Sequence, residues 1–113
     1  MRQELNNNSQ ISKIDRIQEM LRIQSDDCFL LHALGLEYIK IAEYEKAILQ
    51  FEKILTVNDE YVGTYYHLAK TFERINEVEK AIRIYRKGIE MAEKVKDKHA
   101  KNELIMALDE LED

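Results

Sequence analysis

The 113-residue sequence contains no proline and only three glycines. Proteins built from many short strands need these residues in their turns, so their scarcity argues against a β-sandwich or barrel and favours long helices. A single cysteine, Cys28, excludes an internal disulfide and fits a reducing compartment. No apolar run approaches the roughly 20 residues of a membrane span, and the polar N-terminus lacks the apolar segment of a signal peptide. We therefore expect a soluble, cytoplasmic protein with no membrane partner.

An excess of positive charge is also missing, because 17 basic residues face 22 acidic ones and the net charge is −5. Nonspecific nucleic-acid binding draws most of its affinity from lysine and arginine on phosphates, so we expect no nucleic-acid partner. Hydrophobic residues make up 45% of the chain and charged residues 35%, a balance typical of a folded domain. At this length we expect one domain.

The chain does contain an internal repeat of 34 residues. A shift of 34 superposes residues 28–61 on residues 62–95 with eight identical positions. Residue type is kept at three further positions, where the pairs are Gly35 and Ala69, Tyr38 and Phe72, and Phe51 and Tyr85. Two adjacent copies of one structural unit are therefore expected.

Within each copy the apolar residues recur at steps of three and four, which predicts two helices separated by a tight turn. Asn76 in the second turn tolerates a left-handed backbone, whereas Ala42 at the equivalent place does not. Candidate N-caps precede both copies, and they are Ser25, Asp26 and Asp27 for the first and Asn58 with Asp59 for the second.

The flanks complete the pattern. Residues 10–24 match the second helix of a copy and predict half a repeat, after a flexible tail over residues 1–9. Residues 97–112 predict a capping helix whose apolar stripe matches the first helix of a copy after a slip of two residues. We expect one all-α domain over residues 10–112 with about six helices.

This helix–turn–helix period resembles the tetratricopeptide repeat (TPR). The large–Leu–small–aromatic signature of the family's first helix is similar to Leu31, Leu34, Gly35 and Tyr38 in one copy. The resemblance implies a short array of antiparallel helix pairs, a segment of a right-handed superhelix. It also implies a protein–protein interaction module, a scaffold or adaptor without catalysis, that binds a peptide or partner helix in the concave groove of its first-type helices.

The same resemblance indicates which residues line that groove. Carried over position by position, they are Phe29, His32, Leu36 and Ile39, then Gly63, Tyr66, Lys70 and Glu73, with Arg74 beside them. Some family members clamp a C-terminal carboxylate with lysine and asparagine. The matching positions here are His32, Leu36, Lys70, Ala100 and Leu104, of which only Lys70 suits the role, so we do not expect recognition of that type.

Signals for chemistry are weak. The isolated Gly35 and Gly88 indicate close helix packing and not a phosphate loop, and no nucleophile signature surrounds Cys28. His32, His67 and His99 recur at intervals of 35 and 32, but neighbouring helices lie roughly 8–10 Å apart, too far for a shared zinc. We expect no metal, no cofactor and no enzyme activity.

Three alternatives stay open. The basic residues between 80 and 101 form either a patch for an acidic partner or a solvated face paired with local glutamates, and we favour the second. The apolar helix 28–41 either binds another protein or peptide or builds a homodimer or a fixed-subunit assembly. Finally, the helix over residues 10–24 either leaves the groove open or folds over Phe29 and Leu30.

Overall fold

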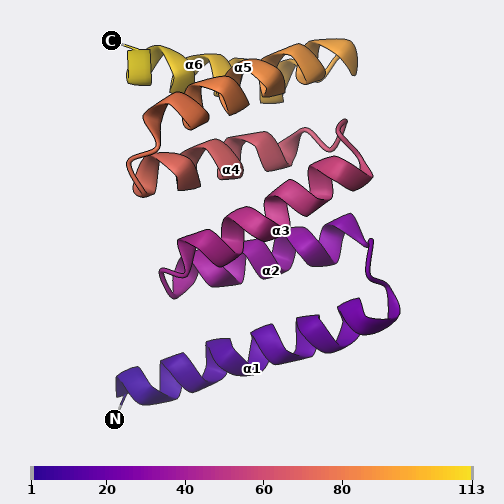
Figure 1. Ribbon diagram of the computed structural model, residues 1–113, viewed down its shortest axis with the longest axis vertical. Helices are drawn as coiled ribbons and strands as arrows, with labels where there is room; N and C mark the ends of the chain where they lie inside the picture. The colour runs from indigo at the N-terminus through magenta and orange to yellow at the C-terminus, as the bar shows by residue number, and fades with distance from the viewer. Residues whose placement is uncertain (1, 113) are drawn as a thin grey trace. The chain divides into compact units, whose positions relative to one another are not determined.

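The computed structural model describes the backbone of residues 2–112 and the side chains of residues 12–112. This part of the chain is all-α, as expected, with no strand. Its six helices are α1 (Arg2–Ile23), α2 (Cys28–Lys40), α3 (Tyr44–Val57), α4 (Gly63–Arg74), α5 (Val78–Lys94) and α6 (Lys98–Glu112) (Figure 1). Among the described residues, no helix combines the length and the apolar character that crossing a membrane requires.

The helices are grouped in two compact units, Met1–Val57 and Asn58–Asp113. In the N-terminal unit α2 and α3 form an antiparallel pair, and α1 packs on α2. In the C-terminal unit α4 and α5 form the equivalent pair, and α6 packs on α5. Each 34-residue copy of the sequence therefore supplies one helix pair, with a single helix added at either end.

Helix α1 begins at Arg2, whereas the sequence analysis expected a helix from residue 10. Neither proline nor glycine occurs before Gly35, so nothing in the sequence stops the helix from continuing towards the N-terminus. The side chains of residues 1–11 lie outside the described part of the chain. The flexibility of a tail over residues 1–9 stays a prediction.

The first of the expected N-caps is confirmed. The Asp27 carboxylate accepts a hydrogen bond of 3.0 Å from the backbone N–H of Leu30, at the start of α2. Asp97, which the sequence analysis did not single out, does the same for Ala100 at the start of α6. In both helices the carboxylate satisfies a backbone donor that has no partner inside the helix.

The expected cap at Asn58 and Asp59 is wrong. The Asn58 side chain accepts from the N–H of Glu60 at 3.0 Å and so closes a turn ahead of the helix. The Asp59 carbonyl accepts from the hydroxyl of Tyr65 at 2.7 Å. Helix α4 begins only at Gly63, with Val62 as an N-cap that makes no side-chain cap bond.

Three helix ends share one turn geometry. Ala42, Asn76 and Lys96 have φ of 61°, 62° and 62°, the left-handed region. In each turn the N–H of the next residue reaches back 2.9 Å to a carbonyl five residues earlier, which is the Schellman arrangement. Ala42 adopts this conformation although alanine does not favour it, because the two hydrogen bonds of the turn and the packing of the helix pair fix the backbone there.

The close packing expected at Gly35 and Gly88 is confirmed. A Cβ atom at Gly35 would lie 2.7 Å from Phe51 Cζ, and one at Gly88 would lie 2.6 Å from Tyr65 Cβ. Both distances are shorter than real Cβ contacts allow. Phe51 and Tyr65 are almost completely buried and form the centre of the core in their respective units.

Candidate functional site

One face of α2 carries the residues that the sequence assigns to the groove of the first repeat. They recur every three or four residues and so lie on one side of the helix, and they are Phe29, His32, Leu36 and Ile39. Phe29 is 73% exposed, and the other three are half-buried. The His32 ring lies 5.5 Å from the Phe51 ring, between centroids. This face, called the α2 outer face below, is apolar and has an exposed aromatic ring near its N-terminal end.

Helix α1 leaves Phe29 uncovered. It lies against a different side of α2, where the Gln18 amide donates to the Tyr38 hydroxyl at 3.0 Å and Ile14 is buried. Tyr38 belongs to the core-facing row of α2, together with Leu31. The alternative in which the helix over residues 10–24 folds over Phe29 and Leu30 is therefore wrong for Phe29, while Leu30 is half-buried.

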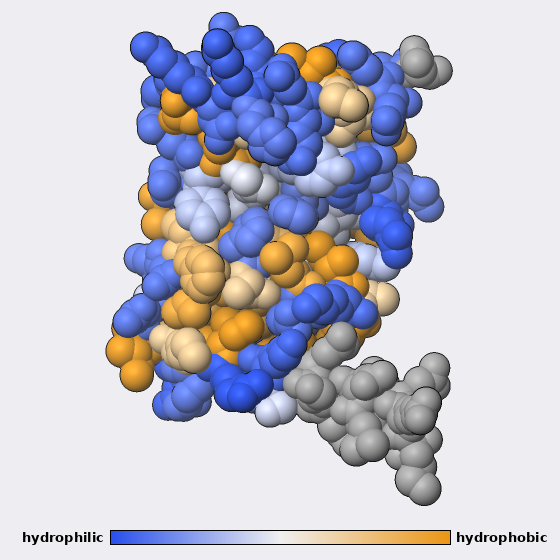
Figure 2. Space-filling model, turned by 180° about the vertical axis from the view of Figure 1, so that it is seen from behind, coloured by the Kyte–Doolittle hydropathy of each residue, from blue (hydrophilic) through white to orange (hydrophobic). Residues whose placement is uncertain are grey.

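Exposed apolar side chains are concentrated in the N-terminal unit. Among residues 12–112, five of the eight large hydrophobic residues that are exposed belong to this unit, namely Met20, Ile23, Phe29, Leu49 and Val57. Figure 2 shows the same contrast, with broad orange areas in the lower part of the view over the N-terminal unit and mostly blue surface over the C-terminal unit. Exposed apolar surface of this kind is typical of an interaction site.

The equivalent face of α4, called the α4 outer face below, is polar. Lys70 Nζ lies 5.7 Å from the centre of the Tyr66 ring and 3.7 Å from Glu73 Oε2. Glu73 also accepts a hydrogen bond from the Tyr85 hydroxyl of α5. Burial, followed by this bond to Glu73, raises the pKa of Tyr85. Tyr66, Lys70 and Glu73 thus form a connected row, with Arg74 exposed at the end of the helix and Gly63 at its start.

Helix α6 has the register that the slip of two residues predicts, with Leu104 and Leu108 buried. Leu104 is only 1% exposed, so matching it to a carboxylate-clamp position of the family is wrong. With the slip of two residues added to two full repeats, Leu104 corresponds to Leu34 and Leu108 to Tyr38, and all four residues are buried. In that register Asn102 and Met106 occupy the outward positions, and both are exposed.

The candidate residues for chemistry are not gathered into a reactive site. Within residues 12–112, no group of three or more His, Cys, Asp or Glu residues could hold a metal ion. Burial, followed by the charges of Asp27 and Asp26, raises the pKa of the Cys28 thiol, which keeps it protonated and a poor nucleophile. Burial lowers the pKa of His67, and the charge of Glu103 opposes this effect.

Most basic residues between 80 and 101 have local partners. Lys80 lies over the Phe72 ring with Nζ 5.8 Å from its centre. The ion pairs of this segment are Arg86 with Glu112 at 2.6 Å, Lys87 with Glu90 at 3.6 Å, Lys94 with Glu60 at 3.1 Å and Lys101 with Glu93 at 3.6 Å. Lys87 and Glu90 pair at helical spacing, whereas the partners of Arg86 and Lys94 are distant in sequence. The contacts favour a solvated face with paired charges, but the expected pairing of Lys94 with Glu90 is replaced by the pair with Glu60.

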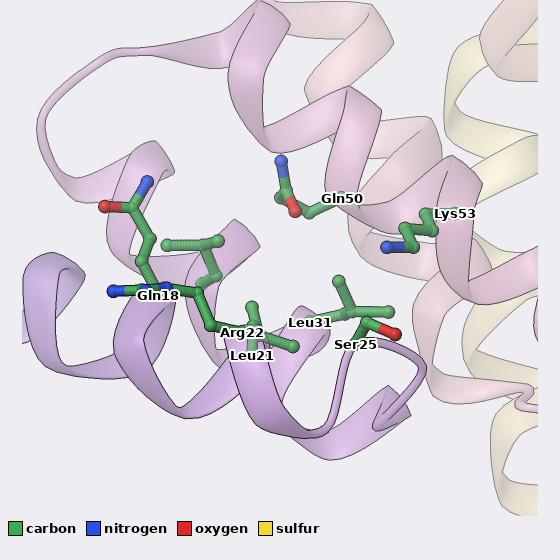
Figure 3. Close-up of a pocket in the computed structure, with 8 residues that line it drawn as sticks. Gln18, Leu21, Arg22, Ser25, Leu31, Gln50 and Lys53 are labelled. Atoms are coloured by element: carbon green, nitrogen blue, oxygen red, sulfur yellow. The ribbon is translucent and has the colours of Figure 1, made fainter.

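A pocket in the N-terminal unit was missed by the sequence analysis (Figure 3). Its volume is about 270 Å³, and it is lined by Gln18, Leu21 and Arg22 of α1, Ser25 of the following loop, Leu31 and Leu34 of α2, and Gln50 and Lys53 of α3. The apolar stripe of helix 10–24 was a signal that this helix covers something. No sequence pattern indicates that a gap remains, because the distance between two packed helices depends on contacts between them and not on either helix alone.

A sequence model described as tetratricopeptide repeat matches residues 30–61 and 62–95. The chain belongs to the tetratricopeptide repeat family. The two matched TPR ranges lie within the copies expected at 28–61 and 62–95. In TPR terms, α2 and α4 are first-type helices, α3 and α5 are their second-type partners, and α1 and α6 are the single helices at either end.

Solved structures of other TPR proteins are similar to this chain. A TPR domain protein from Salinibacter ruber is 36% identical over 77% of this chain and 88% of that chain, with a TM-score of 0.74. The TPR2B domain of yeast Sti1 in complex with pHsp70 is 13% identical, covers 98% of this chain and 89% of that chain, and has a TM-score of 0.84.

A third structure is the first TPR of Spaghetti (RPAP3) bound to the HSP90 peptide SRMEEVD. It is 15% identical, covers 99% of this chain and 87% of that chain, and has a TM-score of 0.74. At these low identities the likeness to the yeast and Spaghetti domains concerns the fold. No curated protein matches the sequence.

Proposed function

We propose that this TPR protein is a protein–protein interaction module, a scaffold or adaptor that binds a peptide or a partner helix on the outer faces of its first-type helices. The observation that carries the proposal is Phe29, a phenylalanine that is 73% exposed on a helix face whose other residues are apolar or half-buried. Aromatic residues, phenylalanine among them, are enriched in protein interfaces relative to the rest of the surface. The proposal assigns binding and no catalysis to this chain.

The two outer faces suit different parts of a partner. The α2 outer face offers Phe29, Leu36 and Ile39 to an apolar stripe, the contact that an amphipathic helix makes in a groove. The α4 outer face offers the Lys70 ammonium, held between Tyr66 and Glu73, to polar or acidic groups. TPR structures that bind an Hsp70 or HSP90 segment support a protein partner for this fold. We place the protein in the cytoplasm, where the unpaired thiol of Cys28 stays reduced.

The test compares two serine variants. Phe29→Ser removes the aromatic ring of the α2 outer face, and Leu49→Ser removes a side chain that is equally prominent, 63% exposed, on α3. Proteins captured from native extract by the unaltered chain are identified, purified and titrated against both variants. We expect Phe29→Ser to weaken binding about tenfold or more at an unchanged melting temperature, and Leu49→Ser to have little effect.

Equal binding by both variants and the unaltered chain would refute the assignment of the α2 outer face. The second candidate use of the same apolar surface is self-association into a homodimer, which the exposure of Phe29 also favours. The mass of the chain in solution distinguishes the two uses: a dimer that Phe29→Ser converts to a monomer identifies a second copy as the partner.

A further inference from the structure

The pocket between α1, α2 and α3 lies entirely within the N-terminal unit and on another side of α2 than the outer face. Leu31 and Leu34 of the core-facing row of α2 lie at its base, where they are 2% and 3% exposed, and Leu21 of α1 is half-buried beside it. In Figure 3, Gln50 and Lys53 of α3 face Leu21 and Leu31 across the open space. An aliphatic side chain would therefore find its apolar contact mainly on Leu21.

The rim of the pocket supplies hydrogen-bond donors and positive charge, and none of the lining residues is acidic. The side chains of Gln50 and Lys53 make no hydrogen bond or ion pair with residues 12–112. Gln18 already donates to the Tyr38 hydroxyl, which fixes the amide at one end of the rim. The charge of this rim is complementary to a carboxylate.

Arg22 is a second cation at the rim, and it can leave its ion pair with Glu19 for a carboxylate bound in the pocket. Its guanidinium lies 3.1 Å from Glu19 Oε2, but the two side chains are 75% and 70% exposed. Exposed pairs within one helix are weak, so a carboxylate in the pocket competes readily for Arg22. Arg22 of α1 and Lys53 of α3 then hold an acidic group from two sides.

We propose that this pocket is a second peptide-binding site, which takes an aliphatic side chain of leucine type flanked by a carboxylate. The volume of about 270 Å³ suits one side chain with its neighbouring carboxylate and is slightly below the range of about 300–1,000 Å³ typical of pockets for drug-sized ligands. The aliphatic group packs against Leu21, and the carboxylate accepts from Lys53, Arg22 and the Gln50 amide. The proposal does not depend on the α2 outer face.

The experiment titrates the full ¹⁵N-labelled chain with the peptide acetyl-Asp-Leu-Glu-amide and follows the backbone amide signals. Two matched peptides separate the contributions: acetyl-Asn-Leu-Gln-amide lacks the charge, and acetyl-Asp-Ala-Glu-amide lacks the aliphatic group. We expect signals of Leu21, Leu31, Gln50 and Lys53 to move with the first peptide. Each matched peptide is expected to bind about tenfold more weakly or not at all.

Variants that reverse or remove a positive charge at the rim locate the site. Lys53→Glu should abolish the shifts and Arg22→Gln should weaken them about threefold to tenfold. Lys13→Glu, the same change of charge at an exposed residue of α1 outside the pocket, should leave binding unchanged. Phe29→Ser should also leave it unchanged, which separates this site from the proposed function.

Four results would overturn the proposal. They are equal binding of the uncharged peptide, shifts confined to residues outside the pocket, equal losses with Lys53→Glu and Lys13→Glu, and a dimer in solution whose pocket signals move on dilution because a second copy occupies the site.

Discussion

The two units of this TPR protein have matching cores and contrasting surfaces. Leu34 and Leu68, one repeat apart, are both buried, as are Ala47 and Ala81. Outside the core the copies diverge. The α2 outer face reads Phe29, His32, Leu36 and Ile39, whereas the same positions of α4 read Gly63, Tyr66, Lys70 and Glu73. Packing constrains the inner rows of both helices, whereas the outer rows are free to differ.

The glycines reveal a second contrast within the matching cores. In the N-terminal unit the glycine lies on the first-type helix, where Gly35 accommodates Phe51. In the C-terminal unit it lies on the second-type helix, where Gly88 accommodates Tyr65. Each helix pair therefore combines one glycine with one large aromatic residue, on opposite sides. These are two different contacts of the repeat, because Gly35 and Phe51 correspond to Ala69 and Tyr85, whereas Gly88 and Tyr65 correspond to Ile54 and Leu31.

The largest expected effect concerns α6, which completes the core of the C-terminal unit. Leu104→Ala should cost about 2–5 kcal/mol of stability, because it leaves a cavity at a residue that is 1% exposed. Met106→Ala, at a residue 65% exposed on the same helix, should change stability by less than about 0.5 kcal/mol. Urea unfolding gives the free energy of unfolding of each variant, and hydrogen exchange of backbone amides measured by NMR shows which unit is destabilised. Equal effects of the two variants would contradict the register of α6.

Alanine in place of the packed glycines should destabilise the two units by different amounts. At Gly35 and Gly88 the added Cβ overpacks the core, which costs about 1–3 kcal/mol and exceeds the gain in helix propensity of about 1 kcal/mol. The loss should be greater for Gly88→Ala, since Tyr65 Cβ is fixed to the backbone whereas the Phe51 ring can turn. Thermal melting measures both.

Gly63→Ala is the control for this pair, because nothing lies within 4 Å of a Cβ atom there. It should leave the melting temperature unchanged or raise it. A rise with Gly88→Ala instead would mean that the α4–α5 contact is looser than the structure has it.

Glycine substitutions in the three left-handed turns should increase the stability of the chain, whereas alanine at the glycine positions decreases it. Ala42→Gly should stabilise the chain by about 1 kcal/mol, because glycine adopts the left-handed conformation without the steric cost of a Cβ atom. Lys96→Gly should gain a similar amount, and Asn76→Gly less, since asparagine already tolerates this conformation. Chemical denaturation of the three variants tests the order. No gain at Ala42 would show that the turn in the N-terminal unit is unstrained.

The smallest expected effect is the response of His67 to acid. Burial lowers its pKa, so the unfolded chain binds a proton at higher pH than the folded one. Its contribution to stability is therefore fully present above the unfolded value of about 6.5 and is lost as the pH falls through the lower folded value. His67→Gln should flatten the dependence of the unfolding free energy on pH just below about 6.5. An unaltered pH profile would contradict the effect of burial.

Much of the fold could be predicted from the sequence because it depends on local spacing. The 34-residue period, the helix pairs and the Asp27 cap follow from residues close together along the chain. The start of α4 could not be predicted, since Asn58 suits a turn as well as a helix cap and only the contact of Tyr65 with Asp59 decides between them. For α6, the slip of two residues in the apolar stripe already indicated the register, and the burial of Leu104 confirms it.

An all-α pair of TPR motifs with a helix at either end could be predicted from the amino-acid pattern alone, because hydrophobic periodicity and small residues at fixed intervals are local properties. Tertiary structure decided what lies at the surface. Phe29 is exposed because α1 packs on the side of α2 that carries Tyr38. A pocket with Arg22 and Lys53 at its rim remains between α1, α2 and α3. Such features depend on how far apart helices pack and which side each one covers, and these distances arise from contacts between residues distant in sequence.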